Sequence, residues 1–215
     1  AATVGGKNGK ALTKLQEGIL GGSRIGFRGV EDLGDGLKAF FQLEAGVAPD
    51  SGSAGGSTTL NSSGSSFFNR GAYVGLSHAT FGEIRVGRQE TLTRENAVKI
   101  NDISNDGQFA LTESLETSTD AIGKGSRPLF QNFGTRIDNA FSYRSPILAG
   151  FQGILTVGLS EDFKGTGTKS AEYEGVGLTF TQGPFNAALS YEQLSGGVAS
   201  GNYNKVVTVG ANYDF

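Results

Sequence analysis

The sequence has no cysteine and no tryptophan, and its 215 residues include only four prolines and one histidine, His78. Without cysteine, the chain has no disulfide framework, no thiolate nucleophile and no cysteine-ligated metal. Without a second histidine, no set of nucleophile, base and acid can be assembled. No charge-free apolar run reaches the roughly 18 residues that a membrane-spanning helix needs. The sequence therefore predicts no catalytic site, no metal site and no cofactor.

Glycine is abundant instead, with 35 residues and no collagen-like triplet period. Glycine is disfavoured inside helices but suits tight turns and closely packed backbone. Hydrophobic residues make up 37% of the chain and the formal net charge is −3, so the chain is neither disordered nor strongly charged. This composition favours many short strands. A strand needs only about 9–11 residues with alternate positions apolar to cross a membrane, so the lack of an apolar helix does not exclude a membrane protein.

Apolar and polar residues alternate along most of the chain from residue 23 onward, which is typical of β-strands with one apolar face. Residues 1–22 lack this period and are predicted to form a loop. The apolar face of 36–47 carries Leu37, Phe41 and Leu43, and that of 135–144 carries Ile137 and Phe141. The nine predicted strands are 23–31, 36–47, 69–77, 83–89, 135–144, 151–160, 173–181, 185–192 and 205–215.

The connections between these strands alternate in length, with short ones such as 145–150 and 182–184 following long ones such as 91–134 and 161–172. One end of the molecule therefore has tight turns and the other has large loops, which is typical of an outer-membrane β-barrel. A single alternating strand is more often part of a soluble β-sandwich. A sandwich, however, has no physical reason to place its short turns at one end and its long loops at the other. Aromatic residues that fit an interfacial girdle lie near the short turns, at Tyr143, Phe151, Phe180, Phe185, Tyr213 and Phe215.

Nine strands cannot close as an antiparallel ring, because neighbours must run in opposite directions around the whole circle and an open edge cannot lie in hydrocarbon. We therefore expect an all-β, transmembrane antiparallel β-barrel that is incomplete in this chain. At least one strand is expected before Ala1 and more after Phe215. Residues 1–215 are expected to form a single barrel domain.

The longest connection, 91–134, carries both apolar and charged side chains. Connections in compact domains are usually short, so one of this length is either functional or disordered. Its apolar residues, among them Leu92, Val98 and Phe109, favour packing against the body of the protein, while six acids and four bases accompany them. We expect this connection to fold into the barrel lumen and to narrow a channel there.

Four segments precede this connection: GSRIGFRGVEDLG at 22–34, KAFFQLE at 38–44, RGAYVGL at 70–76 and FGEIRVGRQ at 81–89. In these motifs and in their order, the chain resembles the Gram-negative general porins, particularly the β-proteobacterial branch. The resemblance covers nearly the whole chain. It implies a 16-stranded channel in the outer membrane of a Gram-negative bacterium, with the third outer loop folded inside and a helical turn within 101–118.

The resemblance also implies partners and excludes others. A homotrimer is expected, in contact with outer-membrane lipid and lipopolysaccharide, with small anions and hydrophilic solutes in transit and no nucleic acid. An enzyme is not expected, because an outer-membrane lipase or protease would need a catalytic histidine and His78 lies near the wrong end. The alternative is an outer-membrane binding or adhesion barrel without channel activity, which would need outer loops that dominate the chain and no inward loop.

The site residues follow from motif position. Arg24, Arg70 and Arg136 match the family's ladder of arginines on the barrel wall, which faces acids of the inner loop across the constriction. By spacing along the loop, Asp102 and Asp106 match those acids. Further lumen-side residues are expected at Arg28, Lys38, Glu44 and Arg88.

Such a site imposes an electric field across the channel. Guanidinium groups stay charged at any working pH, and ionised carboxylates opposite them complete the field that water and solutes cross. The alternative is that the arginines only pair with nearby acids and hold the loop in place. Bases outnumber acids in this set, and screening over about 8–10 Å hides most charges of the outer surface. The sequence therefore predicts a passive diffusion channel for small hydrophilic solutes and ions, with a modest preference for anions.

Overall fold

The computed structural model describes residues 2–5, 11–14, 22–49, 51–54, 66–100, 136–160, 172–195 and 204–215. Most of these residues belong to one antiparallel sheet, in which each main strand is hydrogen-bonded to the next one along the chain. The strands of this meander are β3 (Arg24–Gly34), β4 (Leu37–Ala48), β6 (Gly71–His78), β7 (Gly82–Glu90), β8 (Arg136–Arg144), β9 (Phe151–Gly158), β10 (Glu172–Gln182), β11 (Phe185–Ser195) and β12 (Asn204–Tyr213).

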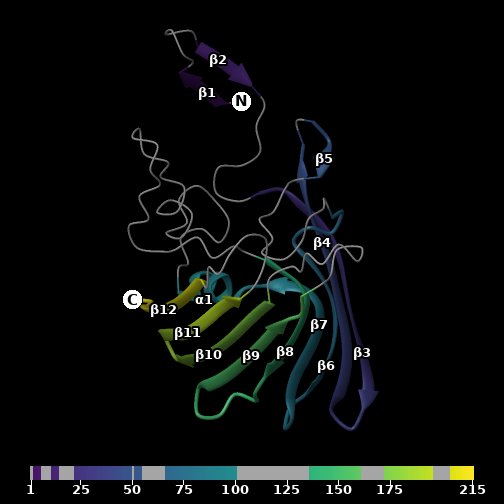
Figure 1. Ribbon diagram of the computed structural model, residues 1–215, viewed down its shortest axis with the longest axis vertical. Helices are drawn as coiled ribbons and strands as arrows, with labels where there is room; N and C mark the ends of the chain where they lie inside the picture. The colour runs from purple at the N-terminus through teal and green to yellow at the C-terminus, as the bar shows by residue number, and fades with distance from the viewer. Residues whose placement is uncertain are drawn as a thin grey trace.

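The sheet curves from β3 to β12, and the helix α1 (Leu92–Ile100) lies against β10, β11 and β12 on one side of it (Figure 1). We call the side that α1 covers the inner face and the opposite side the outer face. Within the described residues, no helix has the length and apolar character needed to span a membrane. All nine predicted strands are present in the sheet, in the predicted order and with antiparallel pairing.

Three further strands lie where loops were predicted, and these predictions were wrong. β1 (Ala2–Gly5) and β2 (Ala11–Lys14) pair as a separate two-stranded sheet. The two residues of β5 (Ser53–Ala54) pair with Val47 and Ala48 at the end of β4. A strand of two to four residues is too short for a period of two to be recognised, so the sequence pattern could not reveal these strands.

Short and long connections lie at opposite ends of the sheet, as predicted (Figure 1). The turn between β3 and β4 shows why the short ones are tight. Asp35 and Gly36 are its two central residues and have φ angles of 51° and 81°. Positive φ at both positions is the requirement of a type I′ hairpin turn, for which Asp-Gly is a preferred pair.

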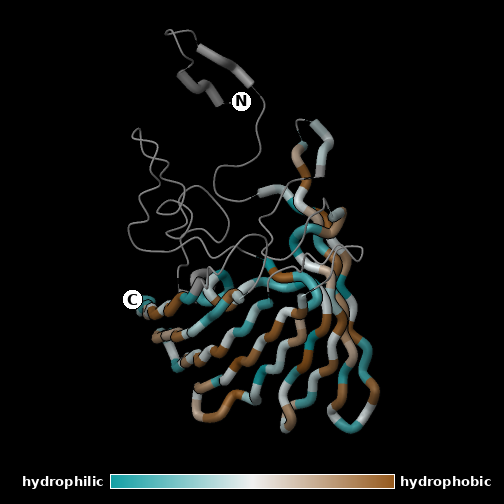
Figure 2. Tube along the Cα trace, viewed as in Figure 1, coloured by the Kyte–Doolittle hydropathy of each residue, from teal (hydrophilic) through white to brown (hydrophobic). Residues whose placement is uncertain are grey.

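The outer face carries large exposed apolar side chains on every strand of the meander from β3 to β12, and the alternation of hydropathy is visible along the strands in Figure 2. Phe27 is 62% exposed and Val209 is 73% exposed, although both are large hydrophobic residues. Phe41 lies on this face together with Leu37 and Leu43, since the polar residues of opposite parity on β4 face α1, as shown below. The predicted apolar parity of β4 is thereby confirmed. A sheet with such an exposed apolar face suits a hydrocarbon environment.

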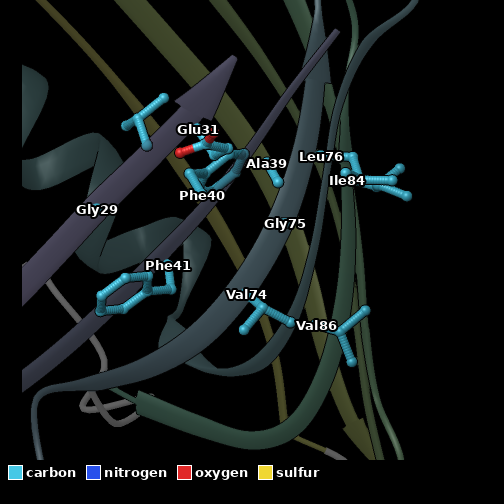
Figure 3. A pocket seen from close by; sticks show the side chains of 11 residues that line it. Gly29, Glu31, Ala39, Phe40, Phe41, Val74, Gly75, Leu76, Ile84 and Val86 are labelled. Carbon is cyan, nitrogen blue, oxygen red and sulfur yellow. The ribbon is translucent and has the colours of Figure 1, made fainter. Parts of the chain in front are cut away.

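The outer face also carries a groove of about 610 Å³ across β3, β4, β6 and β7 (Figure 3). Its lining is mostly apolar, with small residues such as Ala39 and larger ones such as Phe41 and Val74, and it includes one charged residue, Glu31. The glycine at position 29 leaves room for the Phe41 ring, which an added Cβ at position 29 would overlap.

Aromatic side chains gather near the short turns. The Phe151 and Phe180 rings are 4.5 Å apart, and the Phe180 and Phe185 rings are 6.0 Å apart. On the same face, the Tyr143 hydroxyl of β8 donates to the Phe81 carbonyl at the β6–β7 turn over 3.1 Å. These contacts place the aromatic residues where the sequence pattern predicted a girdle.

The inner face differs from the prediction at Ile137, which was assigned to the outer face with Phe141. A β-bulge in β8 shifts the register against β7 between Gly87 and Gln89, and Asn139 within it has a φ of 52°. The extra residue reverses the parity, because a bulge sets two residues against one. Phe141 stays on the outer face, whereas Ile137 is fully buried in a cluster with Ala140 and Tyr173.

Candidate functional site

A polar recess of about 180 Å³ opens on the inner face, bordered by β3, β4, β6, β7 and α1. We call it the inner recess. Its charged side chains within the described residues are three arginines and three glutamates, and Gln42, Gln89 and Tyr73 are its principal neutral polar residues. The charged residues are Arg24, Arg70, Arg85, Glu44, Glu90 and Glu95.

Glu44 lies between two of the predicted arginines. Its Oε1 is 2.5 Å from Arg70 Nε and 3.9 Å from Arg24 Nη1. The strand pairing explains the approach, because the Arg70 amide donates to the Glu44 carbonyl over 3.1 Å and Arg24 is paired with Gly46 on β4. The Arg24 side chain remains 39% exposed, whereas that of Arg70 is 14% exposed.

Arg136 joins this row from β8. Its Nε donates to the backbone carbonyl of Arg70 over 2.7 Å, and its Nη2 is 3.0 Å from Glu90 Oε1. The pairing of β7 with β8 sets Arg136 directly against Glu90. Only 3% of the Arg136 side chain is exposed. The structure thus brings Arg24, Arg70 and Arg136 into one row along the wall.

Arg85 is a further arginine of the recess that the sequence analysis did not assign to it. Its guanidinium carbon lies 5.2 Å from the centre of the Tyr73 ring and 6.0 Å from that of Phe40. Its Nε is also 2.5 Å from Glu83 Oε1. A cation over two aromatic faces is held by their quadrupoles. The signal for Arg85 was its parity, since it alternates with the apolar residues Ile84 and Val86.

Glu95 brings α1 to the recess. Its Oε1 accepts a hydrogen bond from Arg144 Nη2 over 2.5 Å, and Arg144 Nε lies 3.6 Å from Glu83. Arg144 is only 11% exposed. One charge network therefore connects the wall strands to the helix. Its members are Glu83, Arg85, Arg144 and Glu95. No local sequence pattern could pair residues that are 49 positions apart, such as Glu95 and Arg144.

The other predicted residues are placed differently. Arg88 is buried, and it donates to the Asn69 carbonyl from Nε over 2.9 Å and forms an ion pair with Asp138 beside the bulge. Arg28 and Lys38 are exposed side chains on the strands that border the recess but are not among its lining residues. Asp102 and Asp106 lie outside the described residues, as does the helical turn predicted within 101–118. α1 ends immediately before that segment.

The site holds positive and negative side chains at fixed positions around an opening of about 180 Å³. Within the part of the chain that the structure describes, no three His, Asp or Glu side chains are grouped as a metal site would require. Because Arg24 is substantially exposed, its charge is accessible to solutes that enter the recess. Opposite charges at fixed positions around an opening act on the charge and the dipole of such a solute.

A family model described as Gram-negative porin matches residues 1–215 of the chain. The chain belongs to the Gram-negative porin family. This membership confirms the resemblance derived from the four motifs and the predicted location in the outer membrane of a Gram-negative bacterium. Proteins of this family are channels, not enzymes.

Two curated porins match most of the chain. An outer membrane porin protein of Bordetella pertussis is 32% identical over 212 residues, which cover 92% of this chain and 50% of that porin. Outer membrane porin protein 32 of Delftia acidovorans is 32% identical over 197 residues, which cover 90% and 51% of the two chains. The chain thus spans about half the length of the curated relatives it matches.

Solved porins share the fold. The anion-selective porin from Comamonas acidovorans superposes with a TM-score of 0.71 at 27% identity, covering 98% of this chain and 59% of that porin. A Salmonella typhi OmpF structure, solved in complex with daunomycin, gives a TM-score of 0.54 at 16% identity and covers 89% of this chain and 54% of that one. At 16% identity, the likeness to the Salmonella typhi structure shows a shared fold alone.

Proposed function

We propose that this porin is a passive diffusion channel for small hydrophilic solutes and ions across the outer membrane. The observation that carries the proposal is the contrast between the two faces of one curved sheet. The outer face exposes large apolar side chains such as Phe27 and Val209, while the inner face holds the row of arginines and the glutamates of the inner recess. Lipid suits the first surface and a water-filled lumen suits the second.

We further propose a modest preference for anions. In support, Arg24 is the most exposed of the three arginines in the row, with 39% of its side chain exposed against 14% for Arg70 and 3% for Arg136. An anion in the lumen can therefore reach this guanidinium more readily than the other two. The solved porin from Comamonas acidovorans, which shares the fold at 27% identity, is described as anion-selective. Binding must stay weak, because a channel that held its solute tightly could not release it.

The complete channel is proposed to be a closed 16-stranded barrel that assembles as a homotrimer among outer-membrane lipid and lipopolysaccharide. Family membership supports this assembly, and chemical cross-linking of the full-length protein in isolated outer membranes tests it. A ladder that stops at three subunits is expected. A protein that remains monomeric at every cross-linker concentration would contradict the assembly.

Conductance of the full-length protein in planar lipid bilayers tests the channel function. We expect stepwise conductance increases as channels insert, and a zero-current potential in a salt gradient whose sign indicates anions. Swelling of liposomes in small sugars should accompany the conductance. The alternative function is a binding or adhesion barrel without channel activity, and an enzyme is a more distant one. Protein that inserts, resists protease in the membrane and gives neither conductance nor swelling would favour these alternatives.

A further inference from the structure

Glu192 is a fully buried carboxylate on the inner face of β11. Its Oε2 accepts hydrogen bonds from the Thr93 amide over 2.8 Å and from the Thr93 hydroxyl, and its Oε1 accepts one from the Tyr173 hydroxyl over 2.5 Å. These donors are neutral amide and hydroxyl groups. Burying a carboxylate is costly unless hydrogen bonds replace its hydration, so its position on this wall calls for a reason other than stability of the sheet.

The position of Thr93 supplies that reason. Thr93 is the second residue of α1, and the first amides of a helix have no acceptor within the helix. A carboxylate placed there satisfies such an amide and interacts favourably with the helix dipole. Glu192 therefore caps α1 from a strand that is 99 residues further along the chain.

Residues of β10 and β12 contact the same first turn of α1. Thr93 Oγ1 is 2.9 Å from Thr208 Oγ1 on β12, and the Leu92 amide donates to the Tyr173 hydroxyl over 3.2 Å. Leu92 packs on β10 where two glycines leave space. A Cβ at Gly175 would lie 3.0 Å from Leu92 Cδ1 and one at Gly177 would lie 3.4 Å from it. Three adjacent strands thus hold the start of α1.

Two residues further along α1, Glu95 contacts a different part of the inner face. It pairs with Arg144 on β8 and lines the inner recess. The helix therefore bridges two separate parts of the wall within one turn. Its first contact, at Glu192, fixes where its second, at Glu95, can place a negative charge.

We propose that Glu192 is a positioning residue of the channel, which fixes α1 against β10–β12 so that Glu95 keeps its place in the inner recess. The inference rests on the proposed channel function. It predicts that loss of Glu192 changes selectivity only through Glu95. It also predicts that a covalent bond between α1 and β12 can replace the carboxylate.

The test uses full-length protein in planar bilayers, with the zero-current potential and the open-channel current noise as readouts. Glu192→Ala should raise the noise several-fold and shift the potential toward anions, in the direction of Glu95→Gln. In a Glu95→Gln background, Glu192→Ala should add no further shift in potential. Glu174→Ala is the matched control, because Glu174 is an exposed glutamate on the neighbouring strand β10. It should leave both readouts unchanged.

A disulfide provides the rescue. Residues 1–215 contain no cysteine, so within them Thr93→Cys with Thr208→Cys introduces a single pair, at positions whose hydroxyls are 2.9 Å apart. Oxidation of this pair in the Glu192→Ala background should restore the noise and the potential, and a reducing agent should abolish the rescue. If Glu192→Ala does not fold, the same cysteine pair is tested in protein that keeps Glu192. Oxidation should then cross-link it in nearly all molecules, and failure to cross-link would overturn the placement of α1.

The outcomes separate this inference from the function on which it rests. An open Glu192→Ala channel with unchanged noise and potential would overturn the positioning role and leave the channel function intact. Additive shifts of Glu192→Ala and Glu95→Gln would overturn it as well, because Glu192 would then act independently of Glu95. A parent protein that gives no conductance would instead overturn the proposed function.

Discussion

Arg70 Nε lies 2.5 Å from Glu44 Oε1, although the two residues are 26 positions apart in the sequence. The contact forms because Arg70 immediately precedes β6, and its backbone amide donates a hydrogen bond to the backbone carbonyl of Glu44. The same carboxylate oxygen is 3.9 Å from Arg24 on β3. One acid thus lies between two bases from different strands, and its charge lowers the positive potential that both present to the lumen.

Glu44→Gln should therefore strengthen the anion preference. The substitution removes the negative charge between the two guanidiniums but keeps an amide oxygen that can accept from Arg70. The zero-current potential in a salt gradient should shift toward anions in the full-length channel. The shift should shrink as salt approaches 1 M, where the Debye length falls to about 3 Å. Glu31→Gln, at an exposed position of β3 outside the inner recess, is the control. A shift toward cations would show that Glu44 does not act on the permeating ions through its charge.

Replacing the arginines should have the opposite effect. Arg24→Gln should shift the zero-current potential toward cations, and Arg24→Gln with Arg136→Gln should shift it further. Arg24→Gln should change the potential without a large loss in the free energy of unfolding, because an ion pair with this degree of exposure contributes only about 0.2–1 kcal/mol. Arg28→Gln is a matched control on the same strand, because Arg28 is exposed but does not line the inner recess. If the double variant keeps the parent potential, these arginines do not set the field.

Arg136 should differ from Arg24 in its effect on folding. Its side chain is 3% exposed and holds both the Arg70 carbonyl and the Glu90 carboxylate. Breaking a buried pair from one side typically costs about 3–5 kcal/mol, because the partner charge is left without compensation. Arg136→Gln should therefore lower the free energy of unfolding in detergent by an amount toward this range, while Arg24→Gln should lower it by less than about 1 kcal/mol. Equal losses for the two variants would contradict the different burial of the two arginines.

The strands could be predicted from the sequence because their signal is local. A period of two over eight to twelve residues, as in β4 and β6, is set by the two faces of a single strand and needs no knowledge of its neighbours. The tight turn at Asp35–Gly36 was local as well, since two neighbouring residues supply the φ angles it requires.

The positions that escaped prediction depend on residues distant in sequence. The parity of Ile137 is set by a bulge against Gly87 and Gln89, which no pattern within β8 reveals. Glu192 alternates correctly as an inner-face residue, but its role arises only when α1 is laid across β11. Arg24 and Arg70 were assigned from motifs, whereas their common partner Glu44 was expected only as a further lumen residue. The charged residues of the wall are thus visible in the local alternation, whereas their partners lie on other strands and on α1.

Gly75 tests how far the inner wall depends on its glycines. A Cβ at this position of β6 would overlap the ring of Phe40 and the carbonyl oxygen of Ile84. The Phe40 ring packs edge-on against Tyr73 at 6.4 Å, and both rings hold Arg85. Gly75→Ala should therefore displace Phe40 and loosen Arg85, at a cost of about 1–3 kcal/mol in the free energy of unfolding, which is typical of overpacking.

Gly153→Ala is the matched control, because Gly153 is also a strand glycine but the nearest atom to its added Cβ is Ser145 Oγ at 3.8 Å. That distance is ordinary contact, so the control should unfold at the same denaturant concentration as the parent protein or at a slightly higher one, since alanine narrows the unfolded ensemble. The two variants should also differ in the channel. Gly75→Ala should increase the open-channel current noise, because Arg85 loses the aromatic faces that hold it, whereas Gly153→Ala should not. If both variants unfold together with the parent and conduct as quietly, the Phe40 ring has room to move, and Arg85 is held by Glu83 rather than by the aromatic pair.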